Sequence, residues 1–273
     1  MVKVPKIEES AVSSNYILNQ VNAPQGRPSR RLGMSTLGED CVRKMWYRFR
    51  WAKQGNITRR IQRLFDAGHL YEDQVIKSLV EAGMEVTDQQ DMLLGWAGHI
   101  VGYIDGVVTN VPEAPKTPHL LEVKTMNDRN FKEFKKKGIQ KSHPKYYSQA
   151  QAYCGKKKLT RILFACINKN DSELWTERLH FDDDHYRFIM NRGMDVVGSE
   201  LAPPNVIADR GNFACRFCDY SDICYDGANA KQTCRSCKYA DLENEGKWSC
   251  SLHEKDLSNE DQEKGCHHYI TII

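Results

Sequence analysis

Cysteine is distributed unevenly along the chain, and this distribution limits what the C-terminal part can fold into. Seven of the ten cysteines lie between Cys215 and Cys266, in a stretch that is poor in apolar residues. Such a stretch cannot bury enough apolar surface for an independent core, so it needs disulfide bonds or a bound metal ion to hold its fold. Because no secretory signal is visible in residues 1–30, we expect a reducing compartment, where clustered C-x-x-C thiols bind metal rather than form disulfides. Thiolates favour zinc or iron–sulfur clusters over magnesium or calcium.

The composition describes an ordinary globular protein. The 273 residues are 40% hydrophobic and 27% charged, which suffices for one large domain with a small appendage and excludes a disordered chain. The net charge of +3 excludes a histone-like polycation but leaves room for a local basic surface. The sequence has no run of about 18 apolar residues, so we expect no transmembrane helix, no membrane partner and a cytoplasmic location.

Helix-like and strand-like segments alternate along most of the chain. Apolar periodicity predicts helices over residues 39–52, 58–81, 131–137, 146–153 and 185–197, the first of them capped by Ser35 or Thr36. Strand patterns cover residues 96–108, 120–124, 161–167 and 173–179. This order predicts an α/β or α+β fold with a mixed central sheet flanked by helices. We divide the chain into a loose arm (1–30), a main domain (31–230) and a small cysteine-rich module (231–273).

Glu122 and Lys124 lie two residues apart in the short apolar strand predicted at residues 120–124. Side chains alternate between the faces of a strand, so Glu122 and Lys124 share one face while Leu121 and Val123 share the other. A carboxylate and an ammonium at one point suit phosphodiester hydrolysis. The first can hold a divalent metal, and the second can polarise water or stabilise charge on the phosphate. An ordinary salt bridge on an edge strand is the alternative for an isolated pair.

A second carboxylate, Asp105, interrupts the apolar segment from Gly102 to Val108. Burying an unpaired carboxylate is costly, and a bound metal ion would offset that cost. Alternatively, Asp105-Gly106 forms the turn of a hairpin, a role that is typical of Asp-Gly between apolar residues. Three prolines within residues 110–118 already provide a turn before the Glu122 strand, which favours the metal-binding interpretation.

Two helical segments carry further polar residues at one-turn spacing. His69 and Glu72 are three residues apart in the predicted helix 58–81, and Gln149 and Tyr153 are four apart in a later helix, so each pair lies on one helical face. His69 is a candidate third metal ligand, and a nitrogen ligand favours manganese without excluding magnesium. Gln149 or Tyr153 can orient the metal, the lysine or a phosphate. A surface histidine and an ordinary amphipathic helix are the corresponding structural alternatives.

Taken in order, these elements resemble the RecB-like branch of the PD-(D/E)xK nucleases, whose pattern is a helix with a histidine and an acid, a G-x-x-D strand, an E-x-K strand and a Q-x-x-x-Y helix. The matching residues, within about residues 35–225, are Gly68-His69-Leu70-Tyr71-Glu72, Gly102-Tyr103-Ile104-Asp105, Glu122-Val123-Lys124 and Gln149-Ala150-Gln151-Ala152-Tyr153. The resemblance implies a restriction-endonuclease-like core. It also implies a Mg²⁺ or Mn²⁺ site formed by His69, Asp105, Glu122 and the Val123 carbonyl, with Lys124 assisting the water. The remaining members of the expected catalytic set are Glu72, Gln149 and Tyr153.

Cys215, Cys218 and Cys224 form a C-x2-C-x5-C pattern, and a closed tetrathiolate site needs a fourth thiol. Cys41 is the candidate, because similar RecB-like exonucleases, such as those of CRISPR adaptation and the AddAB helicase–nucleases, pair one early cysteine with this late pattern. The resemblance implies a [4Fe–4S] cluster that clasps the two ends of the nuclease domain and restricts the unfolded chain. Zinc at the same four sulfurs is the alternative, which the spacing does not separate from the cluster.

The remaining late cysteines form a set of their own. The sequence predicts a structural zinc knuckle at Cys234, Cys237, Cys250 and Cys266. The alternative ligands in this segment are His253, His267 and His268. Because the knuckle has its own ligands, we expect deletion of residues 231–273 to leave the nuclease fold standing. Cys154 and Cys166 lie in apolar contexts and are expected to be core thiols.

A basic stretch lies between the E-x-K strand and the Gln149 helix, where only Glu133 opposes it. The residues expected to contact DNA there are Lys132, Lys135, Lys136, Lys137, Lys141 and Lys145. A charge run is usually a solvated surface, but beside a phosphodiesterase centre it would guide the DNA backbone. Contacts of this kind carry no base code, so we expect weak sequence preference.

These expectations describe a metal-dependent DNA exonuclease that acts on single-stranded or duplex ends with Mg²⁺ or Mn²⁺, a [4Fe–4S] cluster and a zinc knuckle. A structure-specific or restriction-like endonuclease on the same scaffold is the nearest alternative. A non-catalytic DNA-binding or assembly factor is the alternative from another class. Phage recombination, repair and CRISPR-type DNA processing, with their respective protein partners, all fit, and the oligomeric state stays open.

Overall fold

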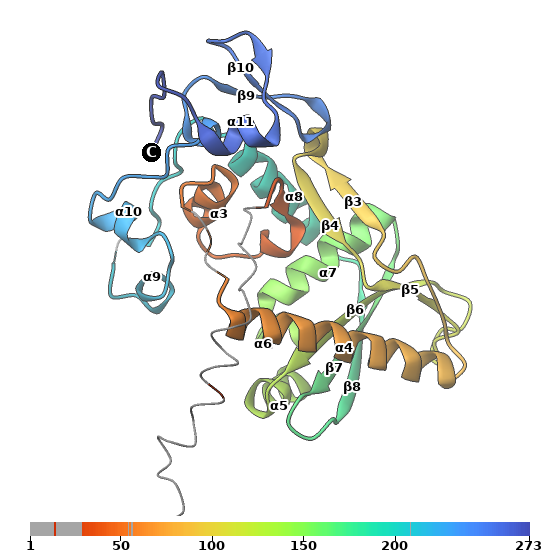
Figure 1. Ribbon diagram of the computed structural model, residues 1–273. Helices are drawn as coiled ribbons and strands as arrows, with labels where there is room; N and C mark the ends of the chain where they lie inside the picture. The colour runs from red at the N-terminus through yellow and green to blue at the C-terminus, as the bar shows by residue number, and fades with distance from the viewer. Residues whose placement is uncertain (1–13, 15–28, 54, 56, 208) are drawn as a thin grey trace, which may run out of the picture.

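The computed structural model of the chain, shown in Figure 1, describes residue 14 and residues 29–273 apart from positions 54, 56 and 208. The loose arm expected at residues 1–30 therefore lies outside the described residues, except for Ser14, Ser29 and Arg30. No helix in the described part of the chain is long and apolar enough to span a bilayer.

A five-stranded mixed sheet with strand order β2-β5-β6-β7-β8 forms the centre of the fold. Its strands are β2 (Glu85–Thr87), β5 (Gly106–Thr109), β6 (His119–Met126), β7 (Arg161–Asn168) and β8 (Leu174–His180). β6 and β7 run parallel, with Glu122 beside Phe164, and the other neighbouring strands are antiparallel. A parallel pair needs a crossover connection, which α5 (Asp128–Lys137), α6 (Ile139–Ser142) and α7 (Pro144–Lys157) supply.

Helix α4 (Arg59–Glu81) lies across one face of this sheet (Figure 1). The Thr58 hydroxyl accepts a hydrogen bond from the Ile61 amide and caps its N-terminus. The C-terminal half of α4 buries Val75, Ile76 and Leu79 against the sheet. The strand residues that meet them are Val108, Leu121, Val123, Leu163, Ala165 and Ile167. The predicted alternation of β6 therefore holds, with Leu121 and Val123 facing α4.

The opposite face of the sheet is covered by the crossover helices. Phe131 and Phe134 of α5 and Ile139 of α6 pack with Phe164 and Cys166 of β7. A strand covered on both faces is apolar along most of its length, as is typical of parallel pairs. The polar pair Glu122 and Lys124 stands out against this background, because it lies on the face toward α7.

A second, three-stranded sheet adjoins the first at Asp105. It consists of β1 (Leu32–Gly33), β4 (Ile100–Tyr103) and β3 (Met92–Gly95), in this order, and the 3-10 helices η1 (Met34–Thr36) and η2 (Trp96–Gly98) border it. The single strand predicted over residues 96–108 is therefore wrong: it is divided between two sheets at Asp105. The chain passes from β4 to β5 without pairing the two strands, so the hairpin-turn alternative for Asp105-Gly106 is wrong as well.

Helices α3 (Val42–Phe49) and α8 (Asp183–Gly198) complete the main body. The cap predicted for the first helix at Ser35 or Thr36 is wrong, because both residues lie in η1. Instead, α3 begins after Cys41, whose Sγ accepts a hydrogen bond from the Lys44 amide at 3.4 Å. Between α8 and the C-terminal tail lie two short helices, α9 (Phe213–Arg216) and α10 (Ser221–Tyr225).

The cysteine-rich tail packs onto the main body rather than beside it (Figure 1). Its elements are η3 (Cys234–Ser236), β9 (Ala240–Leu242), η4 (Asn244–Gly246), β10 (Trp248–Cys250), β11 (Lys255–Asp256) and α11 (Asn259–Lys264). Trp248 is fully buried in the same core cluster as α3, with its ring 5.4 Å from that of Phe49. The boundary at residue 230 stays a prediction, but this packing argues against a dispensable tail.

The predicted fold class is confirmed: a mixed α/β structure with a central mixed sheet flanked by helices and a small cysteine-rich C-terminal part. The junction between its two sheets positions the residues of the candidate site.

Trp248→Ala tests whether the tail belongs to the main core. Removing a fully buried indole should lower the free energy of unfolding of the whole protein by about 3–5 kcal/mol, measured by denaturant unfolding with a probe in the central sheet. Ile270→Ala in the same tail, where the side chain is 44% exposed, is the control and should cost less than about 1 kcal/mol. A main transition that Trp248→Ala leaves unchanged would show that the tail folds separately.

Candidate active site

Asp105 stands where the chain leaves one sheet and enters the other. The ladder between β5 and β6 ends at Gly106 and Leu121, so the amide of Val123 lies beyond the last backbone pair. Asp105 Oδ2 accepts a hydrogen bond from this amide at 2.7 Å. The Asp105 side chain thereby continues the ladder and holds its carboxylate beside Glu122. Burial raises the pKa of Asp105, while Lys124 and the Val123 amide oppose this rise.

Glu122 is fully buried at the middle of β6. Lys124 forms an ion pair with its Oε1, and among the described residues no other group donates a hydrogen bond to either carboxylate oxygen. Burial raises the pKa of Glu122 to about 8, against the opposing effect of Lys124. A carboxylate in this position is costly for the fold unless a cation is bound next to it.

Lys124 is the cation that faces both carboxylates. Its Nζ donates a hydrogen bond to the Val123 carbonyl at 3.2 Å and lies 5.7 Å from the centroid of the Tyr146 ring. Burial by itself would lower the pKa of Lys124, but the negative charges of Glu122 and Asp105 more than offset this and raise it. The ammonium is therefore held charged at the site.

Helix α4 contributes His69 and Glu72 from the other side. Glu72 is partly buried, and its Oε1 accepts a hydrogen bond from Gln90 Nε2 at 2.9 Å. Burial and the nearby charge of Asp105 raise the pKa of Glu72. His69 is exposed, yet it lies close enough to lower the pKa of both Asp105 and Glu72. Sequence analysis missed Gln90, because only the fold brings it to α4.

Helix α7 closes the site with Gln149 and Tyr153. The Gln149 Nε2 donates a hydrogen bond to the Tyr153 hydroxyl at 3.3 Å, and both side chains are buried. Burial raises the pKa of Tyr153, and Glu122 adds to this rise. The ring of Tyr153 lies directly over Gly102, where a Cβ atom would stand 2.3 Å from Cε1. Gly102, the glycine of the G-x-x-D segment, therefore leaves the space that the Tyr153 ring occupies.

The structure thus brings together Glu72, Asp105, Glu122, Lys124, Gln149 and Tyr153, with His69 at the exposed edge. In the described part of the chain, no three histidine, cysteine or acidic side chains converge closely enough to hold a metal ion as they stand. The donor set nevertheless fits a Mg²⁺ or Mn²⁺ ion. It offers two carboxylates and an imidazole, and the buried oxygens of Glu122 have no hydrogen-bond donor besides Lys124 among the described residues.

Cys41, Cys215, Cys218 and Cys224 line one cavity between α3 and the segment of α9 and α10. Cys41 lies at the N-terminus of α3, where the helix dipole favours negative charge on Sγ. The Tyr225 hydroxyl lies 3.3 Å from Cys215 Sγ. Burial raises the pKa of Cys224, and the Cys218 and Cys41 thiols add to this rise. The cavity therefore brings Cys41 together with three thiols that begin 174 positions later in the sequence, at Cys215.

The predicted DNA-binding lysines lie on the crossover helices α5, α6 and α7. Four of them form ion pairs: Lys132 with Asp128, Lys135 with Glu173, Lys137 with Glu133 and Lys145 with Glu39. The view that only Glu133 opposes this stretch is therefore wrong. Among the described residues, Lys136 and Lys141 show no ion pair.

Gly102→Ala tests the contact between the two motifs. The added Cβ would overlap the Tyr153 ring and the Met34 sulfur, so we expect a loss of about 1–3 kcal/mol in the free energy of unfolding and a displaced Tyr153. Gly68→Ala on α4 is the control, because no atom lies within 4 Å of its Cβ position; it should stabilise the helix by about 0.5–1 kcal/mol. Equal stability of the two variants in thermal unfolding would refute the contact.

Comparisons with known proteins yield structural neighbours only. No family model matches the chain, and no curated protein matches it. The alkaline exonuclease LHK-Exo from Laribacter hongkongensis, in complex with dAMP, has a TM-score of 0.47 at 18% identity, over 62% of this chain and 86% of that one. A phage related exonuclease from Haemophilus somnus 129PT has a TM-score of 0.44 at 14% identity, over 61% and 91% of the two chains. These likenesses are too distant to carry an argument, so function has to be argued from the site itself.

Proposed function

We propose that this protein is a metal-dependent DNA exonuclease of the RecB-like PD-(D/E)xK type. The observation that carries the proposal is the fully buried Glu122, which has no hydrogen-bond donor besides Lys124 among the described residues and lies between Asp105 and Lys124. A structural ion pair needs one acid and one base, whereas this site gathers three acids around one lysine. An excess of buried negative charge is what a divalent cation would neutralise.

The proposed ligands are His69, Asp105, Glu122 and the Val123 carbonyl. When bound, Mg²⁺ or Mn²⁺ supplies Lewis acidity and a more acidic water molecule. The hydrogen bond from the Val123 amide to Oδ2 holds Asp105 in place, and its other oxygen, Oδ1, is the proposed metal ligand. Lys124 places a positive charge where negative charge develops on the phosphate.

The remaining polar residues position these groups. Gln149 fixes the hydroxyl of Tyr153, and Tyr153 lies close enough to Glu122 and Lys124 to respond to both charges. Glu72 is oriented by Gln90 and acts on Asp105 through its charge. We propose that Glu72, Gln149 and Tyr153 keep the metal ligands and Lys124 in register rather than react themselves.

The lysines of α5–α7 are proposed to contact the DNA backbone. Lys136 and Lys141, without ion pairs among the described residues, are the first candidates, because Lys132, Lys135, Lys137 and Lys145 would have to give up a carboxylate partner first. Non-specific backbone contact supports a nuclease with weak sequence preference.

The two cysteine sets are proposed to bind structural metal. Cys41, Cys215, Cys218 and Cys224 line one cavity, which supports a [4Fe–4S] cluster or, as the alternative, zinc. Cys234, Cys237, Cys250 and Cys266 line another, which supports zinc. Partners from phage recombination, repair or CRISPR-type processing remain proposals of the same kind.

Cleavage of a labelled linear duplex and of a covalently closed circle of the same sequence, each with Mn²⁺, tests the function. An exonuclease degrades the first and spares the second. Asp105→Asn and Glu122→Gln keep the side-chain shape and should each lower the rate at least ~10²-fold, and Lys124→Met should do the same while metal binding persists.

Glu81→Gln, an exposed acid on α4, is the control and should keep the full rate. Cleavage of the closed circle would favour the endonuclease alternative. Binding of DNA without cleavage of either substrate, in folded protein supplied with Mg²⁺ or Mn²⁺, would favour the non-catalytic factor.

Anaerobic purification tests the cluster. We expect brown protein with visible absorption from thiolate-bound iron, and Cys41→Ala should lose this absorption together with stability. Cys154→Ala and Cys166→Ala are the controls, because both thiols are buried and neither lines either of the two cysteine cavities, so these variants should leave the colour intact. If the anaerobic wild-type protein contained zinc and no iron, Cys41, Cys215, Cys218 and Cys224 would be assigned to a second zinc site instead of the cluster.

A further inference from the structure

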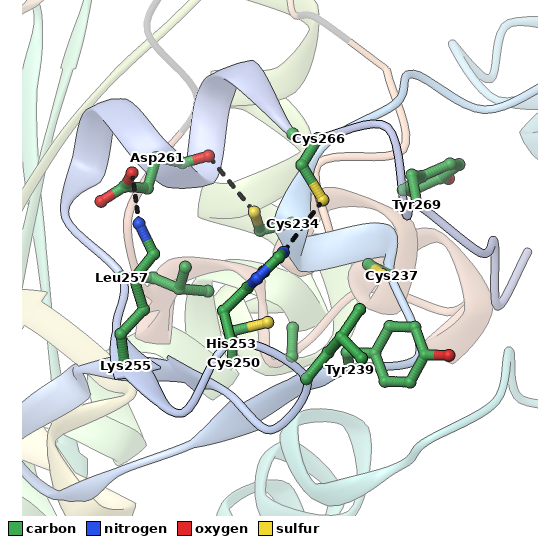
Figure 2. Close-up of a pocket in the computed structure, with 13 residues that line it drawn as sticks. Cys234, Cys237, Tyr239, Cys250, His253, Lys255, Leu257, Asp261, Cys266 and Tyr269 are labelled. Atoms are coloured by element: carbon green, nitrogen blue, oxygen red, sulfur yellow. Dashed lines mark hydrogen bonds and ion pairs between the residues drawn. The ribbon is translucent and has the colours of Figure 1, made fainter.

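The tail encloses a cavity that the proposed nuclease chemistry does not use. Figure 2 shows its lining, in which thiols from separate elements point toward one another. Cys234 comes from η3, Cys237 follows it directly, Cys250 ends β10 and Cys266 follows α11. The C-x-x-C pair on a tight turn has the spacing typical of structural zinc sites, and the two later thiols, which are 16 positions apart, bring the number of sulfurs to four.

The thiols in this cavity have no covalent partner. All ten cysteines of the protein lie in the described part of the chain, and all are free. Cys234 Sγ donates a hydrogen bond to the Asp261 carbonyl at 3.2 Å. Burial, together with the Cys266, Cys237 and Cys250 thiols, raises the pKa of Cys234 to about 11, so these three thiols lie within electrostatic reach of Cys234 in the cavity that all four line.

One histidine competes for a place in this set. His253 Nε2 lies 3.7 Å from Cys266 Sγ, and Figure 2 shows its ring directed into the same cavity. The rings of His267 and His268 are tilted against each other with their centroids 3.9 Å apart, and neither histidine lines the cavity. A zinc ion takes four ligands, so His253 is the rival of Cys266, and His267 and His268 are not.

Arg235 lies between the two cysteines of the C-x-x-C pair and is almost fully buried. Its guanidinium stands 4.0 Å from the ring centroid of Trp51 and 4.7 Å from that of Trp248, and it donates to the Arg30 carbonyl at 2.7 Å and to Gln262 Oε1 at 2.8 Å. Burial lowers the pKa of Arg235, and the Arg50 charge adds to this. Among the described residues no carboxylate pairs with Arg235, so its position depends on η3 being held firmly.

Resting on the zinc ion proposed above for this cavity, we infer that Cys266 and not His253 is its fourth ligand beside Cys234, Cys237 and Cys250, and that zinc at this site holds Arg235 between Trp51 and Trp248. Zinc fixes the turn that carries Arg235, and Arg235 in turn attaches the tail to the end of α3. The site is independent of the proposed nuclease function, since none of its residues belongs to the Asp105 and Glu122 centre.

Zinc content of the full-length protein tests the ligand set. Metal analysis after purification without chelator should find one zinc ion per chain in the wild type, in Cys154→Ser and in His253→Ala. Cys266→Ser, at a partly exposed position, should lose it. If His253→Ala loses the ion and Cys266→Ser keeps it, the tetrathiolate assignment is overturned. Iron in place of zinc, with its loss traced to Cys266→Ser, overturns the choice of metal.

Exchange of zinc for Co²⁺ tests the same ligand set in the wild-type chain, so it does not depend on whether a variant folds. Co²⁺ bound to the wild-type chain in place of zinc should show the intense thiolate-to-metal absorption of four sulfur ligands in a tetrahedral site. A spectrum of three sulfurs and one nitrogen overturns the set without any variant.

Hydrogen exchange tests the link to Arg235. Removal of zinc by a chelator should lower the melting temperature by at least about 5 °C and speed amide exchange both in η3 and in the peptide that covers residues 45–52. Arg235→Met, which keeps the length of the side chain, should speed exchange at residues 45–52 while zinc stays bound. Faster exchange confined to the tail after zinc removal overturns the link between the site and α3.

Discussion

The hydrogen bond from the Val123 amide to Asp105 is the contact on which the site depends. The backbone ladder between β5 and β6 stops at Gly106, and an unpaired amide in the middle of β6 would be costly. Asp105 satisfies that amide with its side chain and so anchors the junction of the two sheets to the strand that carries Glu122. One bond therefore completes the sheet and sets the spacing of the two carboxylates.

The fold holds this site at a local cost. Glu122 is buried with no hydrogen-bond donor besides Lys124 among the described residues, next to a second and a third acid, and Lys124 is the buried cation that opposes the charge of all three. Residues selected only for stability would fill this position with an apolar side chain, as at Leu121 and Val123 on the other face. The rule that buried strand positions carry apolar side chains is broken at this site, where a function is proposed, and it is kept in the surrounding strands.

The sequence predicted those parts of the fold that depend on local pattern. Alternation along β6 placed Glu122 and Lys124 on one face, and one-turn spacing on the helices placed the other site residues in pairs. Contacts between elements distant in sequence were beyond its reach. The fit of the Tyr153 ring over Gly102, the division of the predicted strand at Asp105 and the burial of Trp248 all depend on how separate elements pack. The low apolar content of the tail predicted a separate module, because composition gives the number of apolar residues but not the core into which each of them packs.

The contacts between residues 30–31 and the cysteine-rich tail affect how the protein folds during its synthesis. Arg235 binds the carbonyl of Arg30, and Arg31 binds that of Glu245, so the first described strand is secured by residues that leave the ribosome more than 200 positions later. A core that needs residues 30–31 together with residues 235–245 forms only after the later segment has been synthesised, and contacts of such long range form slowly. We therefore expect the α3 core to stay open until residue 245 has left the ribosome, and a product truncated before that point to expose this core to proteolysis.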